Sequence, residues 1–392
     1  MVGRFVLAMK KVALFFIPLM LWWSCGEEPE DCAGVTGGSA EYDDCGVCNG
    51  DNSTCKDCNG NIDGLAYENE CGCVGGNTGY DPDFCCLDWG LIPFDTYLYN
   101  YNVFDIALNS NNEVYLGVYW DATTLTVTGG SIYKSTDNGL SWSNIYVATG
   151  DFGYIPHAIF VLNSDTIYAV GSGTPGQVLC KSFDSGNNWT YKALGNESIP
   201  YPEPTSISFI NSSIGFVGTA NKGILRTVDG GETWSDIPGL SNTAINSIIF
   251  LTDSIGYALS NDICLKTIDA GISWDTVFQG SSMSLRSIDF IDANTGIIGG
   301  NGILKTVDGG LSWSTVFNQE IRSISFQNNN TIYAVTSDGN IHLSEDEGSH
   351  WIIDCDSDIN CTNVIFNSTT GFVGTGEYYN NPLSGEPMIM RK

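Results

Sequence analysis

The chain has 392 residues and a formal net charge of −30, from 15 Lys and Arg against 45 Asp and Glu. This charge repels phosphate backbones and anionic lipid headgroups, so it argues against nucleic acid as a partner. The length accommodates one large all-β domain and a smaller module, and abundant Gly and aromatic residues with scarce Lys fit a β-rich extracellular fold.

Residues 1–24 are predicted to be a secretory signal peptide. Lys10 and Lys11 precede an almost unbroken apolar run that is too short for a comfortable membrane span, and Ser24-Cys25 follows. A small residue directly before a Cys resembles the lipobox of bacterial lipoproteins, although the two tryptophans that end the run are bulkier than that pattern usually carries. The resemblance implies that Cys25 is lipid-modified and anchors the protein to the cell envelope, at the outer membrane or the cell surface. Two alternatives stay open: an ordinary signal peptide with Cys25 in a disulfide, and a retained anchor helix.

Residues 25–86 are predicted to form an acidic, Cys-rich, irregular tether. Nine cysteines lie between Asp31 and Cys86, and large hydrophobic residues are too few for a core, so disulfides or bound metal must hold the segment. A weak internal repeat relates the stretch that starts at Asp31-Cys32 to the one that starts at Asp57-Cys58.

Acidic side chains and Gly beside the cysteines are suited to a hard cation such as calcium. The segment resembles the acidic Cys-rich repeats of bacterial surface proteins, and more loosely the thrombospondin type 3 calcium repeats, without their regular Asp-x-Asp-x-Asp-Gly ladder. One interpretation is a calcium module; the other is a disulfide-stapled spacer with solvated carboxylates. Zinc at Cys45-x-x-Cys48 and Cys55-x-x-Cys58 is a weaker third, because exported cysteine pairs usually close into disulfides. The candidate calcium ligands are Asp43, Asp44, Asp51, Asp57 and Asp63.

Outside the tether, four further cysteines lie in the second part of the chain. Cys180 and Cys264 occupy apolar strand positions and are predicted to be buried thiols, and Cys355 and Cys361 are close enough in sequence to pair.

The strongest signal is a motif that recurs six times after residue 130. Each copy reads Ser or Thr, any residue, Asp, any residue, Gly, two residues and Trp, and the aspartates at 137, 184, 229, 269, 308 and 346 are 47, 45, 40, 39 and 38 residues apart. That spacing is the length of one four-stranded propeller blade. The Asp, Gly and Trp of the copies are Asp137, Gly139, Trp142; Asp184, Gly186, Trp189; Asp229, Gly231, Trp234; Asp269, Gly271, Trp274; Asp308, Gly310, Trp313; and Asp346, Gly348, Trp351.

These segments resemble the Asp-box of the sialidase and bacterial neuraminidase repeat class. The expected role of the box is structural: Asp accepts hydrogen bonds from backbone amides, Gly supplies a positive φ, and Trp packs between neighbouring sheets.

Residues 87–392 are predicted to form a seven-bladed β-propeller. Alternating apolar segments precede each box, and seven first strands can be counted, near Phe104, Ile159, Ile207, Ile248, Ile288, Ile324 and Ile365. The last repeat ends after its third strand, whereas Trp89-Gly-Leu-Ile-Pro93 copies the start of a fourth strand at Trp234. We therefore predict an all-β fold closed by an N-terminal strand that completes the last blade.

The blades resemble the photosystem II assembly and stability factor family and its relatives outside photosynthesis. This resemblance implies a scaffold that contacts other proteins, and it implies little about photosynthesis. The predicted function is therefore a non-catalytic envelope lipoprotein that binds an envelope or extracellular protein, or a glycan, with its only membrane contact through the anchor and no cofactor besides calcium.

The alternative is a carbohydrate-active enzyme or lectin of the sialidase-like propeller type. Sialidases need three arginines that converge on the substrate carboxylate, together with a Tyr-Glu pair and an Asp. After the signal peptide only Arg226, Arg286, Arg322 and Arg391 remain, and Arg226 and Arg391 take a third-strand position that Lys266 and Lys305 fill elsewhere. The arginines therefore argue against a sialidase.

One set of polar residues is a candidate ligand site. Alignment of the first strands places a polar or cationic residue where each strand starts, near the propeller axis, and such a ring suits an anionic or polar ligand. Solvated strand ends are the alternative. The aligned residues are His157, Thr205, Asn246, Arg286, Arg322 and Asn363.

Overall fold

The structure of the chain is a computed structural model. It describes residues 30–36, 38–42, 48–49, 56, 67–69, 72–74, 89–93, 99–122, 128–147, 154–173, 176–195, 202–336, 338–356, 360–367, 369–376 and 388–392. The predicted signal peptide, Cys25 and the candidate calcium ligands Asp43, Asp44, Asp51, Asp57 and Asp63 lie outside these residues. Two units are described separately below, Met1–Glu68 with Cys73–Gly79, and Asn69–Gly72 with Tyr80–Lys392.

In the described part of the N-terminal unit, a disulfide and a carboxylate fix a loop. Cys32 is bonded to Cys48, so the prediction of a disulfide in this segment is confirmed and Cys48 is not a zinc ligand. Asp31 accepts hydrogen bonds from the amides of Ala33, Val35 and Ala40 at 3.0, 2.9 and 3.0 Å. These bonds, led by the one from Val35, hold the pKa of Asp31 below its usual value. This carboxylate therefore organises the loop around the disulfide.

The described strands outside the propeller are two short ones, β1 (Tyr67–Asn69) and β2 (Gly72–Val74), which pair with each other. A search of the described ranges for a helix able to cross a bilayer finds none.

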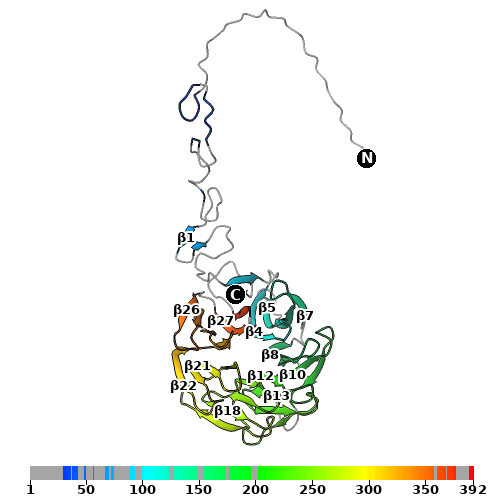
Figure 1. Ribbon diagram of the computed structural model, residues 1–392. Helices are drawn as coiled ribbons and strands as arrows, with labels where there is room; N and C mark the ends of the chain where they lie inside the picture. Colours follow the sequence, from blue (N-terminus) through cyan, green and yellow to red (C-terminus); the bar gives the residue numbers. More distant parts are fainter. Residues whose placement is uncertain are drawn as a thin grey trace, which may run out of the picture. The chain divides into compact units, whose positions relative to one another are not determined.

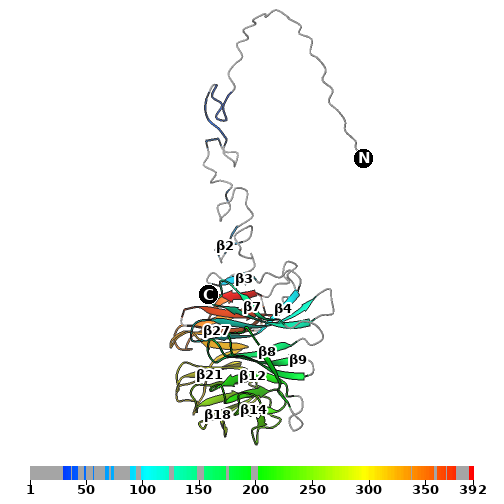
Figure 2. The same cartoon turned by 90° about the vertical axis from the view of Figure 1, so that its right-hand side faces the viewer.

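The remaining strands form seven sheets arranged in a ring, whose colours in Figure 1 run in sequence order around it, and Figure 2 shows the ring from the side. Blade 1 contains β4 (Tyr99–Leu108), β5 (Val114–Ala122), β6 (Thr128–Ser135) and β7 (Ser143–Val147). Blade 2 contains β8 (Ile155–Val161), β9 (Ile167–Gly173), β10 (Gly176–Ser182) and β11 (Thr190–Ala193). Blade 3 contains β12 (Pro204–Phe209), β13 (Gly215–Thr219), β14 (Gly223–Thr227) and β15 (Ser235–Asp236).

Blade 4 contains β16 (Ser247–Phe250), β17 (Gly256–Leu259), β18 (Ile263–Thr267) and β19 (Asp275–Gln279). Blade 5 contains β20 (Ser287–Phe290), β21 (Gly296–Thr306) and β22 (Ser314–Glu320). The first part of β21 pairs with β20 and its second part with β22, so it takes the place of both middle strands. Blade 6 contains β23 (Ser323–Phe326), β24 (Ile332–Val335), β25 (Asn340–Ser344) and β26 (Ile352–Asp356), and blade 7 contains β27 (Cys361–Phe366), β28 (Gly371–Thr375), β29 (Met388–Arg391) and β3 (Gly90–Pro93).

Burial follows the position of each strand in its blade. The second strands β13, β17 and β24 are buried along their whole length, whereas the fourth strand β11 is exposed throughout. The two neighbours of a blade cover the two faces of its inner strands, so the core consists of apolar layers between blades. Cys180 and Cys264 lie in these layers as buried thiols, as predicted, and burial raises the pKa of each to about 12.

The N-terminal strand closes the ring. Gly90, Leu91 and Ile92 of β3 pair antiparallel with Arg391, Met390 and Ile389 of β29, which completes blade 7. The predicted seven-bladed all-β propeller with an N-terminal closing strand is therefore confirmed.

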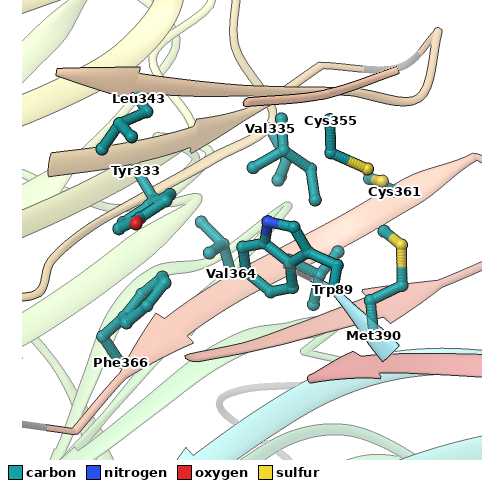
Figure 3. Close-up of a cluster of buried hydrophobic side chains, with 11 residues drawn as sticks. Trp89, Tyr333, Val335, Leu343, Cys355, Cys361, Val364, Phe366 and Met390 are labelled. Atoms are coloured by element: carbon teal, nitrogen blue, oxygen red, sulfur yellow. The ribbon is translucent and has the colours of Figure 1, made fainter. Parts of the chain in front are cut away.

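Trp89, just before β3, is one of the largest fully buried side chains. Its ring lies edge-on to Tyr333 and Phe366, each 5.9 Å away between ring centroids (Figure 3). The predicted pairing of Cys355 with Cys361 is wrong: Cys355 is disulfide-bonded, whereas the Cys361 thiol donates to the Gly339 carbonyl at 3.8 Å.

Candidate functional site at the mouth of the central channel

The first strands of the blades surround a central pocket of about 370 Å³. Each first strand contacts the next one around the ring, and β27 of blade 7 contacts β4 of blade 1. The sheet pairing defines one equivalent residue at the start of each first strand, next to the first residue that pairs regularly with the second strand. We call these seven residues the mouth ring: Phe104, His157, Thr205, Asn246, Arg286, Arg322 and Thr362.

The alignment made from the sequence was wrong by one residue in blade 7. Asn363 pairs with Gly374 as Ser206 pairs with Gly218 in blade 3, so Thr362 is the residue equivalent to Thr205. The sequence alignment matched Ile365 to Ile207, whereas Val364 pairs with Val373 as Ile207 pairs with Val217. Asn363 still lines the pocket, one position further along β27.

Four members of the mouth ring join neighbouring blades. Each has a side chain that bonds the backbone carbonyl just before the next ring residue. Asn246 Nδ2 donates to Leu285 O at 2.6 Å, Thr362 Oγ1 donates to Val103 O at 2.9 Å, and Thr205 Oγ1 donates to Ile245 O. His157 Nδ1 lies 3.1 Å from Pro204 O, and its Nε2 lies 3.1 Å from Ser172 Oγ. Both nitrogens of the candidate ligand residue His157, and the amide of Asn246, are therefore occupied within the protein.

The two arginines of the ring differ in their surroundings. Arg286 Nη1 lies 2.7 Å from Glu320 Oε1 and forms an ion pair with it. Arg322 is half-buried on the pocket wall, and among the described residues it has no ion-pair partner. Its guanidinium is thus the cation of the mouth that a ligand could engage.

An aromatic side chain lies across the ring from these arginines, in blade 1. Phe104 is 42% exposed, and its ring centroid lies 5.7 Å from the His157 ring and 6.1 Å from the Tyr119 ring. Aromatic residues and Arg are both enriched at protein-binding surfaces.

Two carboxyl groups line the channel, and the sequence analysis did not identify them as candidate site residues. Asp105 accepts from Ile159 N of blade 2 and Ile106 N at 2.8 and 2.9 Å, and Asp289 accepts from the amides of Phe326 of blade 6 and of Phe290, both at 2.8 Å. Desolvation raises the pKa of Asp105 to about 7 and that of Asp289 to about 6, despite these hydrogen bonds. A signal was present, since Asp289 replaces a serine that blades 3 and 6 carry at the same strand position.

The box turns lie away from the mouth, between the third and fourth strands. In the blade 3 box, Asp229 Oδ1 accepts from Thr233 N and Thr227 Oγ1 at 2.9 and 2.7 Å, and Thr233 Oγ1 donates to Asp229 Oδ2 at 2.6 Å. The Thr233 hydroxyl and amide bonds lower the pKa of Asp229 to about 2. The same bonds recur at Asp137, Asp269 and Asp308. At Asp184 and Asp346, the residue before the Trp is an Asn or a His, and its side chain takes the place of the hydroxyl.

The box glycines have positive φ and touch the preceding blade. Gly271 has φ +72°, and a Cβ atom there would come within 2.2 Å of the Phe216 ring of blade 3. The box tryptophans pack on aromatic rings of the same two blades, as Trp274 does on Phe216 and Phe250 with centroids 6.4 and 6.0 Å apart.

Comparisons with known proteins agree with this architecture. No family model matches the chain. A stretch of 100 residues is 34% identical to the photosystem II assembly lipoprotein Ycf48 of Prochlorococcus marinus, which covers 24% of this chain and 28% of that protein. The likeness spans well under two thirds of the curated relative's length.

A solved structure described as YCF48 bound to D1 peptide superposes with a TM-score of 0.59 and 16% identity, over 77% of this chain and 94% of that one. The chain is a seven-bladed propeller whose fold is similar to that of Ycf48. A propeller enzyme, the GH74 enzyme of Niastella koreensis, also superposes, with a TM-score of 0.51 and 16% identity over 71% of this chain and 52% of that one. At these identities the structural likeness shows the fold alone.

Proposed function

We propose that this protein is a non-catalytic lipoprotein of the bacterial cell envelope whose propeller binds another protein through the mouth of its channel. The observation that carries the proposal is the composition of the mouth ring. Most of its polar side chains form hydrogen bonds between blades. Phe104 is exposed, and Arg322 has no ion-pair partner among the described residues. An exposed aromatic ring and a cation suit a protein surface better than they suit catalysis.

The likeness to Ycf48 supports a protein partner. The structure of that relative contains a D1 peptide, so a propeller of this fold accommodates a polypeptide ligand. The charge of −30 restricts the partner further, because strongly acidic surfaces are repelled and basic ones are attracted.

Site-specific photo-crosslinking in the native envelope tests the binding face. A photoreactive phenylalanine at position 104 should crosslink a discrete partner, and the additional change Arg322→Gln should reduce that product severalfold. The matched control is the same photoreactive residue at Thr315, which is exposed on the outer strand β22. Equal crosslinking from both positions, or none from position 104, would argue against the mouth as the binding face.

The envelope location is a separate part of the proposal and rests on the Ser24-Cys25 pattern. Metabolic labelling with a fatty acid should mark the parent protein, and Cys25→Ser should abolish the label. If the Cys25→Ser variant still carried the label, Cys25 would be excluded as the lipid site.

We propose the acidic Cys-rich segment as the tether between anchor and propeller. A calcium titration of the full chain by calorimetry distinguishes its two interpretations. Heat that a chelator abolishes would identify a calcium module, and the absence of heat would identify a disulfide-stapled spacer.

A carbohydrate-active enzyme or lectin is the second candidate function, favoured by the carboxyls of Asp105 and Asp289 in the channel wall. A carboxyl with a raised pKa can act as a general acid in glycoside hydrolysis. However, each of these groups already accepts hydrogen bonds from two backbone amides, which argues for a structural role. Release of reducing sugar from plant or envelope polysaccharides, lost in Asp105→Asn or Asp289→Asn, would establish the enzyme instead.

A further inference from the structure

The box turns lie on the face of the propeller opposite the mouth ring. Strands alternate in direction within each blade, so the end of the third strand lies on the same side as the end of the first strand, away from its start. Backbone bonds agree with this: Ala270 of the blade 4 box donates to Ser254 O in the turn after the first strand, and Gly309 of the blade 5 box donates to Asn294 O in the equivalent turn. The propeller therefore has a second face, formed by box turns.

Two adjacent boxes present large apolar side chains on this face. In blades 4 and 5, both the residue before the Asp and the residue after the Gly are apolar, and Ile268, Ile272, Val307 and Leu311 are 69, 67, 65 and 77% exposed. The turn itself does not require them. In blade 6 the same positions hold Glu345 and Ser349, and that box makes the same hydrogen bonds from Ser344 and Asp346.

The two apolar pairs lie at one junction between blades. Lys266 Nζ donates to Gly309 O at 2.6 Å, and Tyr257 Oη donates to the same carbonyl at 2.8 Å. Lys266 is two residues before Ile268, and Gly309 lies between Val307 and Leu311 in sequence. The apolar side chains of blade 4 and of blade 5 are thus brought to a shared surface, which we call the box patch: Ile268, Ile272, Val307 and Leu311.

The surroundings of the box patch are acidic. Asp253 and Asp292 occupy the turns beside it, and Asp269 and Asp308 belong to the boxes themselves. Hydroxyl and amide bonds lower the pKa of Asp269 and of Asp308 to about 2, so both are anionic at neutral pH.

Two nearby lysines offset these carboxylates only in part. Lys266 and Lys305 direct their Nζ atoms to box carbonyls of the next blade, at 2.6 and 2.7 Å. On the box side of blades 4 and 5, the four carboxylates Asp253, Asp269, Asp292 and Asp308 outnumber the two lysines. The local charge is therefore negative, as in the chain as a whole.

We propose that the box patch is a second docking surface, which binds a basic amphipathic segment of a partner protein, with its apolar side chains on the patch and its Lys or Arg side chains on the surrounding carboxylates. Contiguous exposed apolar residues on an otherwise charged protein mark interaction sites. The carboxylates select a cationic partner and disfavour both a second acidic copy of this chain and an anionic lipid surface.

A synthetic 18-residue amphipathic helix of Leu and Lys serves as the probe, with its binding to the full chain followed by fluorescence anisotropy at physiological salt. The variant I268S/I272S/V307S/L311S should bind at least ten times more weakly than the parent. Since it keeps every charge, non-specific attraction between Lys and the acidic protein is the same in both. The matched control is Leu140→Ser, because Leu140 has the same box position in blade 1 and is 70% exposed, and its loss should leave the affinity unchanged.

A second probe of the same composition, with Leu and Lys ordered so that no apolar face forms, should bind parent and variant alike. Equal affinity of the amphipathic peptide for parent and quadruple variant, or no binding to the parent, would overturn the proposal. Parent binding to phosphatidylcholine vesicles that the variant lacks would overturn it in favour of a lipid-contact surface. If the quadruple variant does not unfold cooperatively, the double variant I272S/L311S is measured in its place.

Discussion

The Nζ atom of Lys266 in blade 4 lies 2.6 Å from the carbonyl oxygen of Gly309 in the blade 5 box. Lys181 makes the same contact with Gly230 at 3.1 Å, and Lys305 makes it with Glu347 at 2.7 Å. In blades 2, 4 and 5, the lysine that precedes one box therefore caps the box of the next blade. Blade 6 has Leu343 at this position, and the blade that follows has no box in its sequence.

The replacement Lys266→Met should destabilise the propeller. It removes a charge-assisted hydrogen bond to a carbonyl between blades, which costs about 1.5–3 kcal/mol of unfolding free energy. Urea denaturation measures the change. Lys222→Met is the control, since no side-chain bond of Lys222 holds two blades together in the described structure, and equal losses for both variants would contradict the capping role.

Asp229→Ala should lower thermal stability and leave partner binding intact. The change removes the acceptor for Thr233 N, Thr233 Oγ1 and Thr227 Oγ1, so the box turn loses its internal bonds. We expect Tm to fall by roughly 2–6 °C in differential scanning calorimetry. Asp253→Ala, at an exposed carboxylate in a turn, should change Tm little; a binding defect at unchanged Tm in Asp229→Ala would assign the box a ligand role instead.

Stability should depend on pH in two opposite ways. Desolvation raises the folded-state pKa of Asp105 to about 7, above the value of 3.8 for an unperturbed Asp, so protonation favours the folded state. Its stabilising contribution is full below about pH 4 and is lost as the pH rises from 4 to 7. The box carboxylate Asp308 has its pKa lowered to about 2, so its contribution is present above pH 4 and is lost as the pH falls toward 2.

Denaturation midpoints between pH 2 and pH 8 test both effects. In Asp105→Asn the decline between pH 4 and pH 7 should become shallower, because the replacement cannot ionise. The decline below pH 4 should persist in this variant, since the box carboxylates are unchanged. An identical profile for parent and variant would show that Asp105 does not titrate in this range.

The closing strand should be required for a stable ring. Deletion of residues 87–94 removes β3 and leaves β29 with an unpaired edge, so we expect loss of cooperative unfolding. The milder change Trp89→Ala should cost about 3–5 kcal/mol, because it empties a site between Tyr333 and Phe366. Leu140→Ala, at an exposed position, should stay within about 0.5 kcal/mol of the parent. A deleted protein that melts like the parent would refute the closure.

Repetition made the architecture readable from the sequence. Six boxes at blade spacing, and a seventh first strand near Ile365, predict seven blades. These blades are expected to stack, because a single sheet of this kind cannot bury both faces alone. The likeness of the segment at Trp89 to the fourth strand that starts at Trp234 predicted the closing strand, because the last repeat lacks a fourth strand of its own. The sequence predicted five of the seven mouth-ring residues; it did not include Phe104 of blade 1, and in blade 7 it matched Ile365 rather than Val364 to Ile207.

The sequence by itself determined the blades, the boxes and the order in which they follow, because these depend on local turns and on strand alternation. Only the tertiary structure decided which side chains are available for binding. It uses His157, Thr205 and Asn246 between blades and leaves Phe104 exposed at the mouth, and it places Asp105 and Asp289 in the channel wall. Such contacts join residues about 40 to 50 positions apart, and their partners are set by how whole blades pack, which no short pattern records.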